Sequence, residues 1–138
     1  MINNQKNQPN LRAAWREFLG RHSWNHAAHL TTRHPLSRAA LDIELRDRFI
    51  RRLARIAQRK VAWFAATELT HIGRPHLHVL LGGTEELDTK QLERCWTAGY
   101  SRMHRLVGAK AAVSYAVKEC GHLPDNFELS RIWIPKAR

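Results

Sequence analysis

The sequence predicts an α+β fold, with helices packed on a central and mainly antiparallel β-sheet. Apolar residues recur at every second position in some segments, which is typical of strands, and at spacings of three and four in others, which is typical of helices. The predicted order is helix, strand, helix, hairpin, helix, strand, helix, strand, and strands that return on one another in this way favour an α+β sandwich. No repeat or linker divides the chain. We therefore expect one domain over residues 11–138, behind a polar, disordered tail at residues 1–10.

The first half of the chain is predicted to form a short helix, a strand and a long helix. The short helix covers 11–20, and the weakly alternating segment 24–32 predicts the first strand. From residue 36 to about 58 the spacing is helical. The apolar stripe of this helix consists of Leu45, Phe49, Leu53 and Ile56, widened by Ile43, Ile50 and Ala57. Its opposite side carries Glu44, Arg48, Arg51 and Arg55. The long helix is thus expected to be amphipathic, with a basic outer side.

The second half begins with a predicted β-hairpin. Residues 61–69 are rich in apolar and aromatic side chains and residues 75–81 in branched ones, and a glycine-containing turn separates them. The remaining predicted elements are a helix over 88–98, a strand over 101–107, a helix over 109–120 and a strand over 127–134. The hairpin is therefore expected to form part of the central sheet.

The charge of the chain indicates the class of its partner. The 138 residues include 23 Lys and Arg against 12 Asp and Glu, which gives a net charge of +11 and a pI near 10.8. Such a surface attracts polyanions, and nucleic acid is the expected partner rather than an anionic membrane surface or an acidic protein. No segment has the ~20 consecutive apolar residues of a membrane span, and the first residues lack a signal core, so a cytoplasmic protein is expected. Cys95 and Cys120 form no disulfide framework or metal motif, and no role is assigned to them.

The segment His76-Leu77-His78 is the strongest indication of chemical function. Two histidines one residue apart on a strand point to the same face, so both imidazoles can bind one cation while Leu77 points into the core. The hairpin register places Glu68 opposite His76, and the small Ala66 opposite His78. His76, His78 and Glu68 are therefore predicted as three metal ligands, with further positions open to water and a phosphate oxygen.

Two other interpretations of the histidines stay open. The pair can be structural, because polar groups in a sheet often find hydrogen-bond partners and do nothing else. Branched apolar neighbours argue against this, since they indicate an interior strand where histidines are costly unless they bind something. A zinc site in the first strand region is disfavoured, because no cysteine joins its histidines and their spacing fits no zinc pattern. These histidines are His22, His26, His29 and His34. His29 is kept as a candidate for a place near the metal, from an adjacent strand.

Tyr115 and Lys118 share the polar face of the helix predicted over 109–120. A phenol has a pKa of ~10 and is a poor nucleophile at neutral pH, so attack on phosphorus needs a cation or a base nearby. Lys118 supplies positive charge one turn away. Taken alone, the pair is more simply explained as a boundary tyrosine and a solvated lysine. Together with the histidines, it favours Tyr115 as the nucleophile of metal-assisted phosphoryl transfer.

These residues together resemble the HUH endonuclease superfamily, especially its single-tyrosine rolling-circle replication initiators (Rep proteins). The resemblance runs from about residue 27 to 133, and it is carried by Glu68, by residues 73–81 and by residues 114–118, in that order. It implies an RRM-like or ferredoxin-like palm with a central antiparallel sheet. It also implies a divalent metal, Mn²⁺ or Mg²⁺, on the two histidines and on an upstream polar ligand that Glu68 matches.

The resemblance further implies a reaction and a substrate. Tyr115 matches the tyrosine that cuts single-stranded DNA at an origin or hairpin, stays linked to the 5′ phosphate and frees a 3′ hydroxyl for a polymerase. Lys118 matches the lysine of the family's Tyr-x-x-Lys motif. We also expect Arg74 and the basic helix to hold phosphates of the bound strand, while bases stack on Trp24 or Trp133.

Some features depart from the larger initiators. The chain has no phosphate-cradling Gly-x-x-x-x-Gly-Lys motif of an attached helicase, so unwinding is expected from a host helicase or from superhelical strain. Two alternative functions also remain. One is a single-tyrosine transposase with the same chemistry, and the other is a basic nucleic-acid-binding module that does not cleave.

Overall fold

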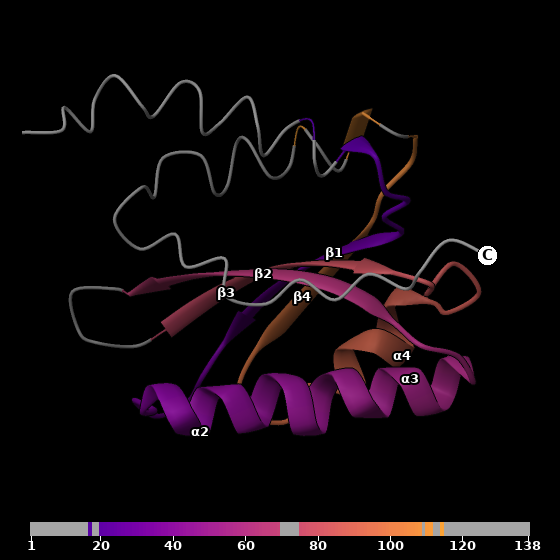
Figure 1. Ribbon diagram of the computed structural model, residues 1–138. Coiled ribbons are helices and arrows are strands. Elements are labelled where there is room, and N and C mark those ends of the chain that lie inside the picture. The colour runs from indigo at the N-terminus through magenta and orange to yellow at the C-terminus, as the bar shows by residue number, and fades with distance from the viewer. Residues whose placement is uncertain (1–16, 18–19, 70–74, 109, 112–113, 115–138) are drawn as a thin grey trace, which may run out of the picture.

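A four-stranded antiparallel sheet is the centre of the part of the chain that the structure describes (Figure 1). This computed structural model describes residues 17, 20–69, 75–108, 110, 111 and 114, with the side chains of residues 68 and 69 left out. The strands are β1 (His26–Thr31), β2 (Ala62–Leu69), β3 (Pro75–Gly82) and β4 (Ser101–Arg105). Their order is β2-β3-β1-β4, and each neighbouring pair is antiparallel. The predicted α+β class and the predicted interior position of β3 are confirmed.

The long helix predicted over 36–58 is present, in three consecutive parts. They are α2 (Arg38–Asp42), η1 (Ile43–Ile50) and α3 (Arg51–Ala57). The helix begins at Ser37, whose hydroxyl accepts a hydrogen bond from the backbone N–H of Ala40 at 3.1 Å. It ends at Gln58, which adopts the left-handed conformation with φ of 54°. Local capping chemistry therefore fixes both ends.

The middle part of this helix, η1, is wound as a π-helix. Every fourth residue of the whole helix is buried, namely Leu41, Leu45, Phe49 and Leu53. In a regular α-helix a spacing of four drifts by about 40° per step, since one turn takes 3.6 residues. The wider π turn offsets that drift and keeps the four side chains on one side. Ile43 and Ile56 fall outside this series, and the prediction that they join the buried stripe is wrong: they are 45% and 43% exposed.

The β2–β3 hairpin has the predicted register. Glu68 pairs with His76 and Ala66 with His78, while the turn residues 70–74 lie outside the described part of the chain. Along β3 the side chains alternate between the two faces of the sheet. Leu77, Val79 and Leu81 join the hydrophobic core that includes Leu45, Phe49 and Leu53. The side of the sheet under the long helix is called the core face, and the side that carries His76 and His78 the histidine face.

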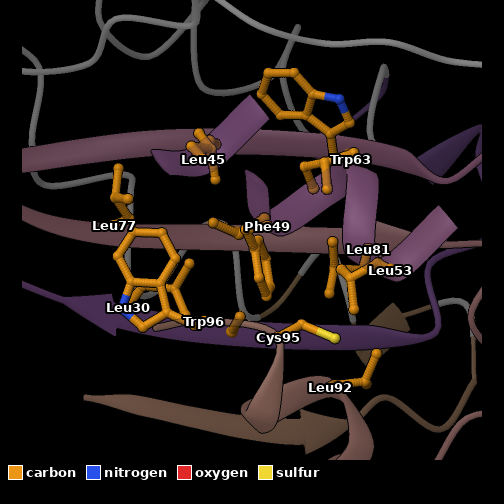
Figure 2. Close-up of a cluster of buried hydrophobic side chains, with 14 of the residues drawn as sticks. Leu30, Leu45, Phe49, Leu53, Trp63, Leu77, Leu81, Leu92, Cys95 and Trp96 are labelled. Carbon is orange, nitrogen blue, oxygen red and sulfur yellow. The ribbon is translucent and has the colours of Figure 1, made fainter. Parts of the chain in front are cut away.

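The core lies between the core face and the helices (Figure 2). Phe49 is fully buried and meets the ring of Trp96 edge-on, with centroids 5.7 Å apart. Trp96 follows α4 (Thr89–Arg94), whose start is fixed by a capping box between Asp88 and Gln91. Figure 1 shows the long helix and α4 on the same side of the sheet. Cys95 packs in this core, and burial raises the pKa of its thiol.

The helix predicted to reach residue 98 ends earlier, at Arg94, because the chain then pairs with the end of β1. The backbone N–H of Arg33 donates to the carbonyl of Ala98 at 3.0 Å, and that of Thr31 donates to the carbonyl of Tyr100 at 2.9 Å. Gly99 permits this approach, since a Cβ there would lie 2.1 Å from the carbonyl oxygen of Thr31. The close contact sets β4 beside β1 as an edge strand.

The remaining predicted elements are described only in small part. The strand predicted over 101–107 is present as Ser101–Arg105. Residues 110, 111 and 114 are helical, in agreement with the helix predicted over 109–120, whose other residues lie outside the described part. The strand predicted over 127–134 lies wholly outside it, and residues 17 and 20 are the described helical positions of the predicted first helix.

We predict that Phe49→Ala lowers the free energy of unfolding by about 3–5 kcal/mol, because it removes a ring from a core that cannot collapse around the cavity. Ile43→Ala is the matched control from the same helix, and its half-exposed side chain should cost less than about 1 kcal/mol. Urea titrations of both variants measure this difference. Equal losses for the two positions would contradict the described packing of the helix.

Candidate functional site

Three histidines lie together on the histidine face. His76 and His78 come from β3 and His29 from β1, where the register sets His29 directly opposite His78. The rings of His29 and His78 are stacked, with centroids 4.8 Å apart and planes 9° apart. The ring of His76 meets that of His29 edge-on at 5.2 Å. The candidate position of His29, beside the pair and on an adjacent strand, is therefore the one that the structure has.

The surroundings of this histidine cluster, made of His29, His76 and His78, combine a closed floor with an open side. Ala66, opposite His78 in the register, is fully buried, and Phe64 and Leu80 beside it are 1% exposed. His78 itself is buried, whereas His29 and His76 are half-buried. One imidazole is thus fixed deep in the sheet, and two remain partly accessible to a ligand.

The donor set was tested against a bound metal ion. Among the described residues, no three histidine, cysteine, aspartate or glutamate side chains form a group that can hold a metal ion. Stacking accounts for this within the histidine cluster, because parallel rings hold their nitrogens in separate parallel planes. Glu68 lies opposite His76 in the backbone register, but its side chain is outside the described part. Two imidazoles and one carboxylate are nevertheless a donor set that divalent metals accept with positions left open for substrate.

The other predicted site residues are Tyr115, Lys118 and Arg74, and all three lie outside the described residues. The described chain approaches Tyr115 as far as Ser114, which is helical and exposed. The predicted role of Trp24 as an exposed stacking surface is wrong, because Trp24 is 6% exposed. The second predicted stacking residue, Trp133, lies outside the described part.

Two residues of β4 and its approach extend the histidine face, and the sequence reasoning missed both. Arg102 lies directly opposite His29, so that Arg102, His29 and His78 form one row across three strands. Arg102 is exposed and makes no ion pair with any described residue. Tyr100 continues the same register opposite Thr31 and is 83% exposed. The alternation within 100–104 was the available signal, but it locates these residues only once β4 is known to pair with β1.

The disfavoured zinc site is not formed by the described histidines. The alternation of β1 puts His26 and His29 on opposite faces of the sheet. His26 is fully buried, and its Nδ1 lies 2.6 Å from the hydroxyl oxygen of Thr84. Asn25 accepts hydrogen bonds from the backbone N–H groups of Gly83 and Thr84 at 2.7 and 3.1 Å. These contacts give His26 a structural role, which is to fasten the turn after β3.

A comparison with known families decides the class of the protein. Residues 25–122 match the family described as replication-associated protein ORF2, which is more than half of the chain. The chain belongs to this family. Its members are rolling-circle replication initiators, consistent with HUH Rep proteins. The matched region includes every predicted site residue, namely Glu68, Arg74, His76, His78, Tyr115 and Lys118.

Membership in the replication-associated protein family connects the chain with rolling-circle DNA replication, with DNA as its partner and with endonuclease activity in general. No curated protein and no solved structure gives a significant match to the chain. Within the described residues, no helix is long and apolar enough to cross a membrane.

We predict that His26 makes the stability of the fold depend on pH. Burial, followed by the charge of Arg105, lowers the pKa of His26 below its ordinary value of 6.5, and Glu85 opposes this. Below pH 6.5 the unfolded chain therefore binds a proton that the folded chain binds less readily, and stability falls as the pH falls toward the folded pKa. In denaturant titrations between about pH 7 and 5, His26→Asn should show a shallower decline than the unmodified protein.

His104→Asn is the control for this experiment, because His104 is exposed on β4. It should keep the slope of the unmodified protein. An unchanged slope in the His26 variant would show that the buried imidazole is not the group responsible.

Proposed function

We propose that this protein nicks and rejoins single-stranded DNA at an origin or hairpin, with Tyr115 as nucleophile and a divalent metal, Mn²⁺ or Mg²⁺, on His76, His78 and Glu68. The product is a 5′-phosphotyrosine intermediate, and the nick starts rolling-circle replication of a plasmid, phage or similar element. The observation that carries the proposal is the hairpin register, which sets both histidines on one face and Glu68 opposite His76.

The proposed reaction balances without an outside energy source. The phenol of Tyr115 loses its proton to solvent, and its oxygen forms a bond to the scissile phosphorus. The bond between phosphorus and the 3′ oxygen breaks, and that oxygen takes up a proton to become the free 3′ hydroxyl. A divalent cation held by the histidines stabilises charge on the phosphate oxygens. Attack by a 3′ hydroxyl on the phosphotyrosine reverses the steps and reseals a strand.

The described residues divide the remaining work between them. His29 stacks on His78 and limits the rotation of that ring, which makes it a positioning residue for the metal ligands. Arg102 supplies a positive charge in the same row, suited to a phosphate that enters from the β4 edge. Tyr100 offers an exposed ring on which an unpaired base can stack. Lys118 and Arg74 add charge near the phenolate and along the strand.

The nucleophile is tested with a labelled single-stranded oligonucleotide that carries the origin of the element, in the presence of Mn²⁺. The unmodified protein should form a covalent adduct that survives a denaturing gel, and Tyr115→Phe should form none. Tyr100→Phe is the matched control, since these are the two tyrosines of the chain. It should keep the adduct, with weaker binding of the strand. An adduct that persists in the Tyr115 variant would overturn the assignment, and binding without cleavage by the unmodified protein would support the non-catalytic alternative.

The metal ligands are tested by the Mn²⁺ concentration that gives half-maximal cleavage. His78→Ala should remove cleavage at every concentration, and chelation of the metal should do the same to the unmodified protein. His29→Ala should retain cleavage but need roughly 10–100-fold more Mn²⁺, because it supports a ligand and is not one itself. His104→Ala, exposed on β4, is the control and should behave like the unmodified protein. A His78 variant with unchanged Mn²⁺ dependence would contradict the site.

A further inference from the structure

A row of three arginines lies on the outer side of the long helix, and the proposed cleavage site does not use it. Arg48, Arg51 and Arg55 are exposed and follow one another at helical spacings of three and four. This set is called the arginine stripe. Arg48 donates to Glu44 at 2.6 Å, whereas Arg51 and Arg55 make no hydrogen bond or ion pair with any described residue. Two guanidinium groups therefore remain available for a ligand.

The fold itself does not account for these two charges. The neighbouring Arg52 shows what a structural arginine does in this helix, because it donates to the carbonyl of Cys95 at 3.0 Å and to the hydroxyl of Thr97 at 3.1 Å. The helix dipole favours a cation near the helix end, which applies to Arg55 but falls off before Arg51. Residues 51–60 contain no acidic side chain. The second half of the helix is thus a cationic surface with no described internal partner.

The arginine stripe and the histidine cluster lie on opposite sides of the sheet. The buried side of the helix, with Leu45, Phe49 and Leu53, packs on the core face, so its outer side points away from the sheet. The expectation that the basic helix holds phosphates of the cleaved strand is therefore not met by the geometry. A short strand bound at His76 and His78 cannot touch the stripe without passing around the molecule. Any DNA that contacts the stripe must be a different part of the substrate.

The composition of the stripe indicates which part. Surfaces for single strands combine cations with exposed aromatic rings on which bases stack. Among the described residues, the large hydrophobic side chains that are exposed are Ile43, Ile56, Tyr100 and Val107, and none of them is an aromatic residue of the helix. A straight row of guanidinium groups without rings suits regularly spaced phosphates, and in a duplex these are held on a stiff rod.

We propose that the arginine stripe binds the phosphate backbone of duplex DNA next to the nicking site, as a second DNA surface separate from the histidine face. The identity of the polyanion as DNA rests on the proposed function, but the stripe does not depend on the identity of the nucleophile. Its contribution is independent of sequence, because phosphate contacts position a protein on DNA without reading bases. It would hold the protein on the double-stranded flank while the single strand occupies the other face.

The test compares two double variants that remove the same charge. The first is Arg51→Gln with Arg55→Gln. The second, the control, is Lys90→Gln with Arg94→Gln, two exposed positions of α4. Fluorescence anisotropy measures binding to a blunt duplex of about 20 base pairs and arbitrary sequence over a range of salt concentrations. The stripe variant should lose roughly tenfold or more in duplex affinity at about 0.15 M salt, and its log–log salt slope should become shallower by about 1.8. The control variant should lose much less.

Cleavage of a short single-stranded oligonucleotide is measured on the same proteins. The stripe variant should cleave it at the rate of the unmodified protein, because the oligonucleotide does not reach the helix. Equal losses of duplex affinity in both double variants would reduce the effect to net charge and overturn the proposal, as would loss of single-strand cleavage in the stripe variant. If the unmodified protein cleaves nothing, the proposed function fails, and the duplex titrations still decide on the stripe.

Discussion

The alternation of side chains along β3 is the constraint on which the core and the site both depend. Leu77, Val79 and Leu81 must face the helix, because the core is built on them. The intervening residues then have no choice but to face the other way. A slip of one residue in the hairpin would bury His76 and His78 against the helix and expose the leucines, at a cost of several buried apolar side chains. The packing of the core therefore enforces the placement of the histidines.

The sequence predicts the local part of this arrangement well. The pairing of Glu68 with His76 follows from a hairpin, whose register depends on residues that are close in the chain. The strong apolar flanks likewise identify β3 as an interior strand. Contacts between distant segments were harder to predict. That His29 stacks on His78, or that Arg102 joins their row, follows from β1 lying between β3 and β4, and the strand order is not written in any local pattern.

Other differences have physical causes of their own. The π-helical winding of η1 selects every fourth residue for burial, which is why Ile56 is exposed although an ideal α-helical stripe includes it. The end of α4 is set by a long-range pairing of Ala98 with Arg33 and not by a stop signal in the helix. Trp24 looked like an exposed ring because it stands in a polar stretch, yet it is buried. Periodicity predicts a face, but only tertiary contacts decide what covers that face.

The position of β4 at the edge of the sheet affects how the protein behaves in concentrated solution. An edge strand presents unpaired backbone groups with which another copy can pair. Here Arg102, His104 and Arg105 are all exposed along five residues. Two copies that paired through this edge would bring their cationic side chains face to face, and like charges on adjoining strands repel. The residues that favour DNA on this side therefore also discourage stacking of sheets into fibres, and a crowded cell should keep the edge open for nucleic acid.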